Sequence, residues 1–328
     1  MNILVVGGAG YIGSHMVRLL DRKGHTVVVL DNLCTGYKAA VQAGELVIGD
    51  MADRELVESV LKKHKIDSVM HFAAHALVGE SVENPAKYYQ NNVVATLALL
   101  EAMRNCEVQR LVFSSTCATY GVPDKMPMDE TIPQRPVNPY GFTKLVCEQA
   151  MQDYADAYGL GFAALRYFNA AGASTDGVIG EDHNPESHLI PIVLQVALGQ
   201  REHITVFGDD WPTPDKTCVR DYIHVDDLGA AHLLALEKIK SGEGIKVNLG
   251  TGTGFSVRDV IECCREITGC EIKEVMGQRR AGDPPELVCN PAKANEMLGW
   301  KPEYDTLRPI VETAWAWHKN NPTGYAKS

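Results

Sequence analysis

The sequence predicts an α/β protein, with a doubly wound parallel sheet followed by a smaller C-terminal lobe of mixed α/β structure. Three observations lead to this prediction. A short apolar run at Ile3–Val6 ends in glycines, as a strand buried on both faces does, and a helical pattern follows it. Strand-like and helical patterns then alternate up to about Tyr167. From about Ala170 the chain becomes polar, glycine-rich and irregular, so we predict a first domain at residues 1–169 and a second at 170–328, with an approximate boundary that segments can cross.

The turn after the first strand has a glycine at every third position, Gly7, Gly10 and Gly13, and apolar residues follow at helical spacing. Such a turn lets the backbone approach a pyrophosphate closely, because no Cβ stands in the way. The helix that follows would offer unpaired N–H groups and its positive dipole end to the same phosphates. An ordinary strand-to-helix turn has a similar pattern, so the glycines alone are weak evidence for a dinucleotide site.

The second strand supplies stronger evidence. Thr26–Leu30 is apolar and β-branched, and it ends in Asp31, 18 residues after Gly13. A carboxylate near this position accepts hydrogen bonds from an adenosine ribose and repels a 2′-phosphate. We therefore predict a Rossmann domain that binds NAD rather than NADP.

The other elements of the first domain follow in order. Four more strands are predicted, at Glu45–Ile48, Ser68–Phe72, Leu111–Ser115 and Phe162–Tyr167. Helices are predicted from the N-cap Asp53 to about His64, and over Pro85–Arg104 and Pro139–Tyr158. Ligands of a doubly wound sheet bind at the carboxyl ends of its strands. The residues at those ends are Gly7, Asp31, Asp50, Phe72 and Ser114 to Thr116.

The second lobe shows shorter elements. We predict helices at Leu189–Leu198, Val225–Lys240, Val257–Ile267 and Thr306–Lys319, and strands at Ile204–Phe207, Val247–Leu249 and Lys273–Val275. Loops are predicted over Ala170–Ser187 and Asp209–Thr217, and residues 321–328 are expected to be loose. This lobe would close over the cofactor.

A catalytic motif lies at the start of the predicted helix Pro139–Tyr158. Tyr140 and Lys144 are four residues apart, so they share one face of that helix. A free tyrosine has a pKa of about 10, and lowering it to near 7 requires about 3 units, or roughly 4 kcal/mol. A nearby ammonium and a positively charged nicotinamide ring would stabilise the phenolate. Surface Tyr–Lys pairs are common, but after a dinucleotide turn this pair predicts a catalytic base.

Upstream of that pair, a predicted strand ends in three hydroxyl side chains, Ser114, Ser115 and Thr116. One of them could lie against a substrate hydroxyl and against Tyr140. Serine and threonine at a strand end also satisfy local backbone groups, which is the simpler alternative. With Tyr140 and Lys144 downstream, we favour the catalytic interpretation.

Composition limits the partners and the compartment. The formal net charge of −11 argues against nucleic acid or an anionic membrane as a partner, and it requires local arginines for any anionic ligand. The nine cysteines include no Cys-x-x-Cys pair, which indicates free thiols in a reducing cytoplasm, and we predict no metal site. The chain begins inside a strand at Asn2, so no signal peptide is expected, and no apolar stretch is long enough to span a bilayer.

Further motifs accompany the glycine turn, the hydroxyl-rich strand end and the Tyr140/Lys144 pair. They are Asp31-Asn32-Leu33, Phe72-Ala73-Ala74, Gly79-Glu80-Ser81-Val82, Asn91-Asn92-Val93, Arg166-Tyr167-Phe168-Asn169, Arg220 to Val225 and Arg279-Arg280-x-Gly-Asp283. In this order, and essentially from end to end, they resemble the extended short-chain dehydrogenase/reductase superfamily, and within it the UDP-glucose 4-epimerase family. The resemblance implies an NAD-dependent isomerase of galactose metabolism that interconverts UDP-galactose and UDP-glucose through a transient 4-keto sugar.

The resemblance also assigns roles to residues. Tyr140 would take the proton of the sugar 4-hydroxyl, Lys144 would bond the nicotinamide ribose and lower the Tyr140 pKa, and Thr116 would relay or orient the 4-hydroxyl. The cofactor-binding residues that it implies are Gly7, Gly10, Tyr11, Ile12, Gly13, Asp31, Asn32, Leu33, Cys34, Thr35, Gly36, Asp50, Met51, Phe72, Ala73, Ala74, Ala76, Asn91, Ser114, Thr116, Tyr140, Lys144, Tyr167 and Phe168. The substrate-binding residues that it implies are Thr116, Tyr140, Asn169, His188, Leu189, Thr205, Val206, Phe207, Arg220, Arg280, Asp283 and Leu287.

Three details of the resemblance concern contacts and assembly. A well-known bacterial pattern of the family has a lysine at the position of Ala76, so one cofactor contact would be weaker here. Leu287 would lie beside the C2 substituent of the sugar, where members restricted to glucose and galactose carry tyrosine and members accepting N-acetylated sugars carry a small residue. The family further implies a homodimer with Tyr88–Met103 and Val146–Tyr158 packed between the subunits.

Other functions remain as alternatives. The chain could epimerise another UDP-sugar, with an N-acetylated, uronate or pentose group, or act as a nucleotide-sugar 4,6-dehydratase or decarboxylase. Dehydratases of this kind need an acid–base pair after the strand-end threonine, and Cys117-Ala118 stands there, which disfavours elimination. A redox-sensing binding protein that kept the cofactor turn could lose the Tyr140/Lys144 pair, and this chain retains it.

Overall fold

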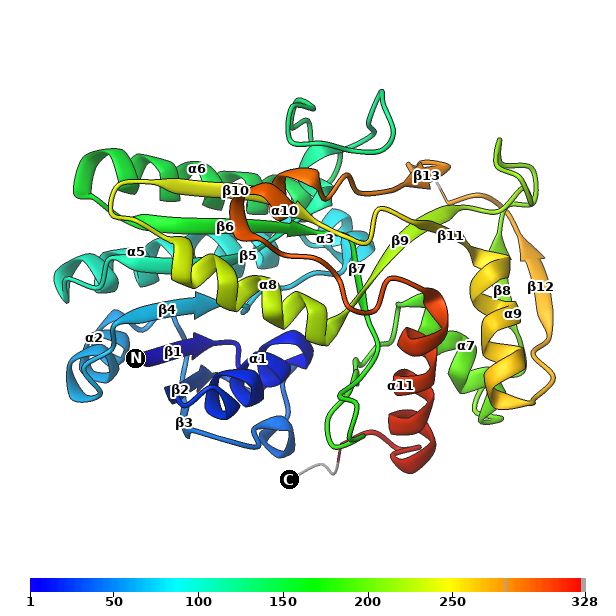
Figure 1. Ribbon diagram of the computed structural model, residues 1–328, viewed down its shortest axis with the longest axis horizontal. Helices are drawn as coiled ribbons and strands as arrows, with labels where there is room; N and C mark the ends of the chain where they lie inside the picture. Colours follow the sequence, from blue (N-terminus) through cyan, green and yellow to red (C-terminus); the bar gives the residue numbers. More distant parts are fainter. Residues whose placement is uncertain (281, 326–328) are drawn as a thin grey trace.

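The first lobe is built on a seven-stranded parallel sheet in the computed structural model, which describes residues 1–280 and 282–325. Its strands are β1 (Asn2–Val6), β2 (Thr26–Asp31), β3 (Glu45–Ile48), β4 (Ser68–His71), β5 (Arg110–Thr116), β6 (Gly161–Tyr167) and β10 (Gly244–Leu249). They lie in the order β10-β6-β5-β4-β1-β2-β3 and all run parallel (Figure 1). The chain order reverses between β1 and β4, and such a switch point opens a crevice at the carboxyl ends of the strands. The predicted doubly wound sheet is confirmed.

Helices cover both faces of this sheet. One face is covered by α1 (Tyr11–Arg22), α8 (Val225–Lys238) and α10 (Ala292–Leu298), and the other by α2 (Arg54–Lys63), α5 (Ala95–Asn105) and α6 (Pro139–Tyr158). Along β1, Ile3 and Val5 pack on the α1 side, whereas Leu4 and Val6 pack on the α2 side. This burial on both sides explains why the strand is a continuous apolar run rather than an alternating pattern.

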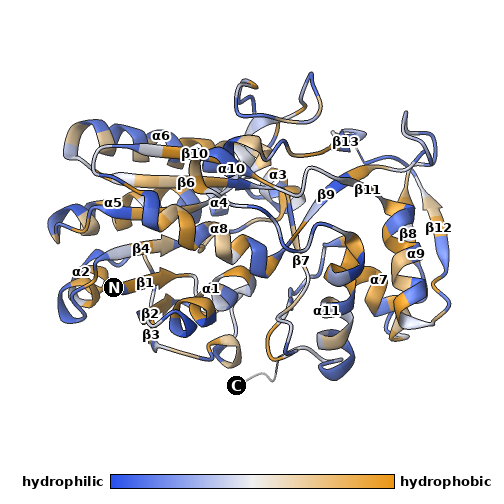
Figure 2. Ribbon diagram, viewed as in Figure 1, coloured by the Kyte–Doolittle hydropathy of each residue, from blue (hydrophilic) through white to orange (hydrophobic). Residues whose placement is uncertain are grey.

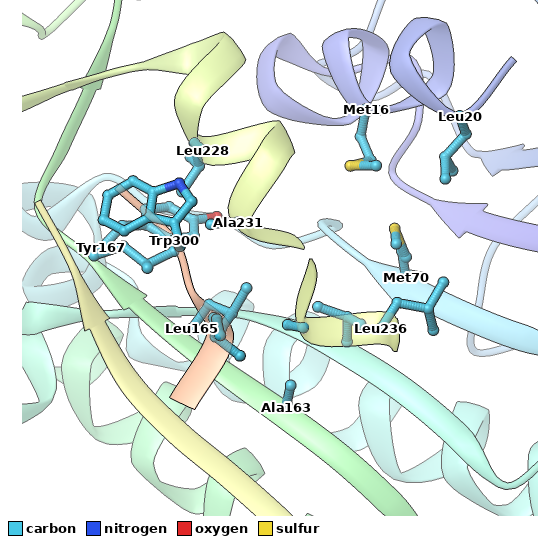
Figure 3. Packing of buried hydrophobic residues seen from close by; sticks show 14 of the residues in the cluster. Met16, Leu20, Met70, Ala163, Leu165, Tyr167, Leu228, Ala231, Leu236 and Trp300 are labelled. Carbon is cyan, nitrogen blue, oxygen red and sulfur yellow. The ribbon is translucent and has the colours of Figure 1, made fainter. Parts of the chain in front are cut away.

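The core beneath α1 and α8 is one packed cluster (Figure 3). Met16 from α1 and Leu228 from α8 belong to it together with Trp300, which follows α10. The Trp300 indole N–H donates to the Asp227 carbonyl at 3.0 Å, so its buried polar atom is satisfied. Figure 2 shows the same organisation as hydropathy, with apolar strands inside and polar stretches on the outer surfaces of the helices.

The second lobe has its own small core. Its sheet consists of β7 (Asn169–Ala171), β9 (Val219–His224), β11 (Gly254–Ser256) and β13 (Glu286–Leu287), and β8 (Ile204–Phe207) pairs with β12 (Glu274–Gly277). Three helices, α7 (Leu189–Ala197), α9 (Val257–Thr268) and α11 (Leu307–Asn320), pack around these strands (Figure 1). This is the smaller mixed α/β lobe that the sequence predicts.

The prediction omits β7, β9, β11 and β13, and it assigns β10 to the wrong lobe. β9 is missing from the prediction because Asp221 and His224 interrupt the apolar pattern, yet the buried Asp221 carboxylate accepts backbone N–H groups from Thr251, Gly252 and Cys289. β10 is predicted as a short strand of the second lobe, but it pairs with β6 and completes the first sheet. Because α8 also packs on that sheet, the chain crosses between the lobes after residue 170.

The predicted helix Pro85–Arg104 is divided into three parts. It consists of α4 (Pro85–Tyr88), a π-helical turn η2 (Tyr89–Val94) and α5, and a short helix without a predicted counterpart, α3 (Val78–Glu83), precedes it. Single π-helical turns inside longer helices often mark functional sites. Two 3₁₀ turns complete the described elements, η1 (Lys38–Ala40) and η3 (Cys117–Tyr120).

The end of the chain is anchored up to Tyr325, so the prediction of a loose tail is wrong for this part. The Tyr325 N–H donates to the Asp182 carboxylate at 2.8 Å, and the Gly180 N–H donates to the Tyr325 hydroxyl at 3.0 Å. The Tyr325 ring also packs on Trp317, with 5.2 Å between the ring centroids. Residues 326–328 of the predicted tail lie outside the described residues.

Candidate active site

A cavity of about 530 Å³ gathers most of the predicted site residues at the carboxyl ends of the strands. The predicted cofactor residues that line it are Gly7, Gly10, Tyr11, Ile12, Gly13, Asp31, Asn32, Cys34, Thr35, Asp50, Met51, Phe72, Ala73, Ala74, Ala76, Asn91, Ser114, Thr116, Tyr140, Lys144, Tyr167 and Phe168. The predicted substrate residues that line it are Thr116, Tyr140, Asn169, His188, Asp283 and Leu287. Both lobes therefore contribute to one cavity.

The turn from β1 to α1 fits a pyrophosphate. A Cβ on Gly7, which has φ +80°, would lie 2.5 Å from the Ala73 nitrogen, and a Cβ on Gly13 would collide with the Gly7 carbonyl oxygen. In the described structure no side chain caps α1 at Gly10, and its first turn contains no acidic residue. The first N–H groups of α1 and its dipole are therefore available to an anion, as the predicted dinucleotide requires.

Asp31 joins this turn to the end of β2. Its carboxylate oxygens accept the backbone N–H groups of Ala9 at 2.9 Å and Leu33 at 2.8 Å. Burial raises the pKa of Asp31, and these two hydrogen bonds offset part of the rise. Each carboxylate oxygen has a further acceptor site, so Asp31 can also accept the hydroxyls of a ribose in the cavity that it lines.

Thr116, Tyr140 and Lys144 meet where β5 ends and α6 begins. Thr116 is the last residue of β5, and its hydroxyl oxygen accepts the Ala118 N–H at 3.1 Å. It lines the cavity together with Tyr140, which lies near the start of α6. Lys144 is 3% exposed, and its ammonium donates to the Ser114 carbonyl at 2.7 Å. The structure thus places two hydroxyl groups and a buried ammonium in one cavity.

The protein alone does not lower the Tyr140 pKa in the way the sequence analysis expects of Lys144. Burial raises the pKa of Tyr140 to about 12, and the neighbouring Thr116 side chain offsets only part of this rise. Burial also lowers the pKa of Lys144 to about 8. A positively charged nicotinamide ring, the second source named above, would favour the phenolate.

A buried ion pair holds the strand end in place. Glu148 on α6 pairs with Arg166 on β6 at 2.5 Å and accepts the Ser115 hydroxyl at 2.5 Å. Arg166 also donates to the Tyr120 hydroxyl at 2.8 Å, and that hydroxyl donates to Asn248 on β10 at 2.7 Å. Removing one member of a buried pair leaves an uncompensated charge. This network therefore fixes α6 relative to β5 and β6, and with it the group around Tyr140.

Eight predicted site residues do not line the cavity: Leu33, Gly36, Leu189, Thr205, Val206, Phe207, Arg220 and Arg280. Gly36 instead allows its loop to approach the glycine turn, because a Cβ there would lie 2.9 Å from Ala9. The Arg280 guanidinium lies 4.0 Å from the centroid of the Phe207 ring, and Arg220 lies 3.9 Å from Asp283 at the cavity wall. Their roles in substrate binding stay predictions.

Several lining residues have no counterpart in the prediction. They include Val78, Val82, Cys117, Val137, Asn138, Glu181, His183 and Pro284. Val78 and Val82 come from α3, and the Gly79–Val82 motif was their signal in the sequence. Glu181 and His183 lie in a stretch predicted as irregular loop, where the spacing Glu-x-His-x-x-Glu-x-His was the signal.

The segment 181–188 brings charge to the cavity. The carboxylate of Glu181, which is 3% exposed, lies 2.8 Å from His188 Nδ1 and 3.1 Å from His183 Nδ1. Burial lowers the pKa of His188, but the Glu181 carboxylate outweighs it and raises that pKa to about 10. In the protein alone, this histidine therefore favours its cationic form.

Comparison with known proteins gives consistent relatives. Residues 3–250 match the model of the NAD dependent epimerase/dehydratase family. A UDP-glucose 4-epimerase of Halalkalibacterium halodurans is 53% identical over 327 residues, which cover 99% of this chain and 98% of that protein. The structure of UDP-glucose 4-epimerase from Brucella ovis in complex with NAD is 51% identical, with a TM-score of 0.93 over 96% of this chain and 97% of that one. The enzyme from Bifidobacterium longum in complex with NAD+ and UDP is 37% identical, with a TM-score of 0.94 over 99% of this chain and 100% of that one.

These similarities extend over both lobes, and not only over the glycine turn. They agree with a cavity that places that turn and Asp31 beside the Tyr140 group. The resemblance drawn from the motifs is confirmed, and NAD is the cofactor of this type of protein. The chain belongs to the NAD dependent epimerase/dehydratase family.

Proposed function

We propose that the chain interconverts UDP-galactose and UDP-glucose by NAD-dependent epimerisation at C4. The observation that carries this proposal is the position of Thr116, Tyr140 and Lys144 in the same cavity as the glycine turn and Asp31. A hydroxyl base beside a dinucleotide site is what the oxidation of a sugar alcohol and its reversal require. The relatives named above are UDP-glucose 4-epimerases matched over both lobes, which supports a UDP-sugar as the substrate.

Each catalytic residue has its own task in this reaction. Tyr140 accepts the proton of the 4-hydroxyl when C4 becomes a ketone, and it returns that proton when C4 is reduced. Thr116, which lines the same cavity, orients the 4-hydroxyl. Lys144, fixed by the Ser114 carbonyl, keeps a positive charge at the base of the site. NAD, when bound, supplies the acceptor and then the donor of the hydride.

Epimerisation also requires the 4-keto sugar to present its opposite face. The wall near Tyr140 includes Val82, Ala118 and Val137, whose side chains cannot form hydrogen bonds with sugar hydroxyls. Such a wall encloses the sugar without fixing one orientation. The diphosphate stays bound meanwhile by the second lobe, where Arg220 and Arg280 are the expected cations.

Elimination is a weaker alternative. A 4,6-dehydratase needs a carboxylic acid directly after Thr116, but Cys117 lines the cavity there and Ala118 follows. Burial raises the pKa of the Cys117 thiol to about 12, so it cannot replace a carboxylic acid at neutral pH.

One assay tests the proposal. Purified protein is incubated with UDP-galactose without added NAD, the sugar nucleotides are separated, and NAD is measured after denaturation. We expect UDP-glucose to form and NAD to be released from the protein. No UDP-glucose from protein that contains NAD would overturn the epimerase assignment, and a 4-keto-6-deoxy product would identify a dehydratase instead.

We also propose a homodimer formed by the helices that the sequence analysis names. Tyr89, Val94, Leu97 and Phe142, on η2, α5 and α6, have exposed apolar side chains, with exposures from 37% to 47%. The rings of Tyr89 and Phe142 lie 6.4 Å apart, which joins the two helices into one apolar face. Exposed apolar patches of this kind mark protein interfaces.

The cytoplasm is the proposed compartment. All nine cysteines lie in the described part of the chain, and they are free thiols there. Free thiols are typical of a reducing compartment. Among the described residues, none of the helices combines the length and the apolar character needed to cross a membrane.

A further inference from the structure

Two glutamates and two histidines converge in the segment between β7 and α7. Glu181, His183, Glu186 and His188 each direct one potential ligand atom to a common point, with all four atoms within 4.8 Å of one another. His188 Nδ1 lies 2.8 Å from Glu181 and 3.1 Å from Glu186. His183 Nδ1 lies 3.1 Å from Glu181 and 3.8 Å from Glu186. Each imidazole thus faces both carboxylates through the same nitrogen.

Hydrogen bonds account for one contact of each imidazole, His183 Nδ1 with Glu181 and His188 Nδ1 with Glu186, both at 3.1 Å. They leave the His188–Glu181 and His183–Glu186 contacts unexplained. An imidazole nitrogen carries one proton or one lone pair, so it can serve one of its two carboxylate neighbours well. Zn²⁺ binds histidine nitrogens and carboxylate oxygens at about 2.0–2.2 Å, which places the ligands of a tetrahedral site about 3.3–3.6 Å apart. The observed separations of 2.8 to 3.8 Å between nitrogen and oxygen bracket this spacing.

Burial makes a positive charge necessary at this point. The side chains of Glu181 and Glu186 are each 4% exposed, and among the described residues their ion-pair partners are His183 and His188, with no lysine or arginine. Two neighbouring buried carboxylates need compensating cations. Either two imidazolium groups or one divalent metal ion with neutral imidazoles supplies the two charges.

Neighbouring groups hold the cluster in position. The Glu186 carboxylate accepts the backbone N–H groups of Ser187 at 2.8 Å and His188 at 2.9 Å, which orients it before any ion binds. The His183 ring packs edge-on against Tyr11 of the cofactor turn, with 6.1 Å between centroids. The Tyr11 hydroxyl in turn donates to the Gly172 carbonyl at 2.7 Å, so this corner connects the two lobes.

We propose that Glu181, His183, Glu186 and His188 form a binding site for one divalent transition-metal ion, with Zn²⁺ as the best match. Four protein ligands leave no open coordination position, so the ion has a structural role. It fastens the segment before α7, which lines the cavity through Glu181, His183 and His188, to the cofactor turn at Tyr11. It also neutralises two carboxylates beside a cavity that accepts phosphates. The site departs from the sequence analysis, which predicts no metal and places His188 among the substrate-binding residues. It does not depend on the proposed function.

Metal content of purified protein provides the first test. The full chain, expressed without a histidine tag in medium with added zinc, is dialysed against metal-free buffer and measured by mass spectrometry of its elements. We expect about one Zn²⁺ per chain in the wild type and a loss of most of it in Glu181→Gln and in His183→Asn. The matched control is His64→Asn, because His64 lies 3.6 Å from Glu45 outside the cluster, and it should keep the metal.

A second test uses metal-free protein and does not depend on expression conditions. Chelator-treated wild type is titrated with Zn²⁺ by calorimetry and with Co²⁺ by visible absorption, where tetrahedral coordination gives intense bands. We expect one site per chain, tetrahedral Co²⁺ bands, and a rise in Tm with Zn²⁺ that Glu181→Gln and the milder Glu186→Gln lack. Circular dichroism and retained NAD verify that each variant is folded.

The possible outcomes distinguish the metal-site proposal from the proposed epimerase function. Wild type that binds Zn²⁺ no more tightly than folded Glu181→Gln, and shows no tetrahedral Co²⁺ bands, would overturn the metal site and leave the cluster as a proton-sharing network. Epimerase activity in such metal-free protein would leave the proposed function intact. Protein that binds Zn²⁺ as expected but has no epimerase activity would retain the metal site and overturn the function.

Discussion

At the scale of single residues, the chemistry depends on the phenol of Tyr140. Tyr140→Phe removes only the phenolic oxygen, so we expect kcat with UDP-galactose to fall about 10²–10⁴-fold while NAD stays bound. Lys144→Ala should reduce both kcat and NAD content, because it removes the buried charge and its bond to the Ser114 carbonyl from the cavity wall. Initial rates and NAD released per chain measure these effects. A Tyr140→Phe variant with nearly unchanged kcat would exclude Tyr140 as the base.

A second prediction at the scale of single residues concerns which UDP-sugars the protein accepts, and it depends on Leu287. This residue lines the cavity from β13, where the family resemblance places it beside the C2 substituent. Leucine is smaller than tyrosine, so we expect UDP-galactose to be the main substrate and UDP-N-acetylgalactosamine a weaker one. Leu287→Tyr should remove the second activity and spare the first, because overpacking against the acetyl group costs about 1–3 kcal/mol. Leu287→Met is the control of similar volume, and an unchanged ratio of the two kcat/KM values in Leu287→Tyr would place Leu287 away from the sugar.

At the scale of elements, the turn between β1 and α1 has no room for a side chain at its last glycine. Because a Cβ on Gly13 would collide with the Gly7 carbonyl, Gly13→Ala must displace the start of α1. We expect it to lose NAD and to lower Tm, at a cost of about 1–3 kcal/mol. The matched control is Gly79→Ala on α3, where a Cβ meets no atom within 4 Å. It should keep NAD and be neutral or more stable by about 0.5–1 kcal/mol, since alanine favours a helix. Full NAD content in Gly13→Ala would contradict this account of the turn.

At the scale of the whole molecule, the apolar face of η2, α5 and α6 predicts the assembly. Leu97 is 37% exposed in the middle of this face, so Leu97→Glu should convert a dimer into a monomer by burying a charge at the interface. Met297→Glu is the control, because Met297 is 40% exposed on α10, away from that face. Size-exclusion chromatography with light scattering gives the masses. A wild-type protein with the mass of a monomer at micromolar concentration would contradict the proposed homodimer.

Buried histidines predict how the stability of the whole fold depends on pH. Burial lowers the pKa of His15 and His232 to about 4 and that of His71 to about 3. In the unfolded chain these groups titrate near 6.5, so between that pH and about 4 the unfolded state binds more protons. This part of the stability is present above pH 6.5 and is lost as the pH falls. Burial raises the pKa of Asp226 to about 6 and also raises those of Asp31, Asp221 and Asp227, and these carboxyls oppose part of the loss. Burial lowers the pKa of His224 to about 3 as well, which adds to the loss.

The expected result is a Tm that falls on acidification from pH 7 to pH 4.5. His232→Gln should make the free energy of unfolding less dependent on pH, by up to about 1.4 kcal/mol per pH unit within that window. Denaturant unfolding at several pH values provides the slopes. Identical slopes for wild type and His232→Gln would show that His232 titrates alike in the folded and unfolded states.

The sequence could predict those parts of the fold and the site that depend on local pattern. The run Ile3–Val6 indicates a doubly buried strand because both of its faces pack on helices, and Tyr140 and Lys144 share a face because they are one helical turn apart. The elements that the sequence analysis missed depend on residues that lie far away in the chain. β9 contains Asp221, which is tolerated only because backbone N–H groups of two later segments bind its carboxylate.

By itself the sequence determined the doubly wound sheet, the dinucleotide turn, the carboxylate Asp31 and the pairing of Tyr140 with Lys144, because periodicity and short spacing are local properties of a chain. Only the tertiary structure decided that β10 completes the first sheet, that Thr116 lines one cavity with Tyr140, and that burial raises the Tyr140 pKa. It also decided that the 181–188 segment folds its four ligand atoms onto one point beside the cavity. These features arise from contacts between residues far apart in the chain and from the removal of water around them, and neither is visible in the order of the amino acids.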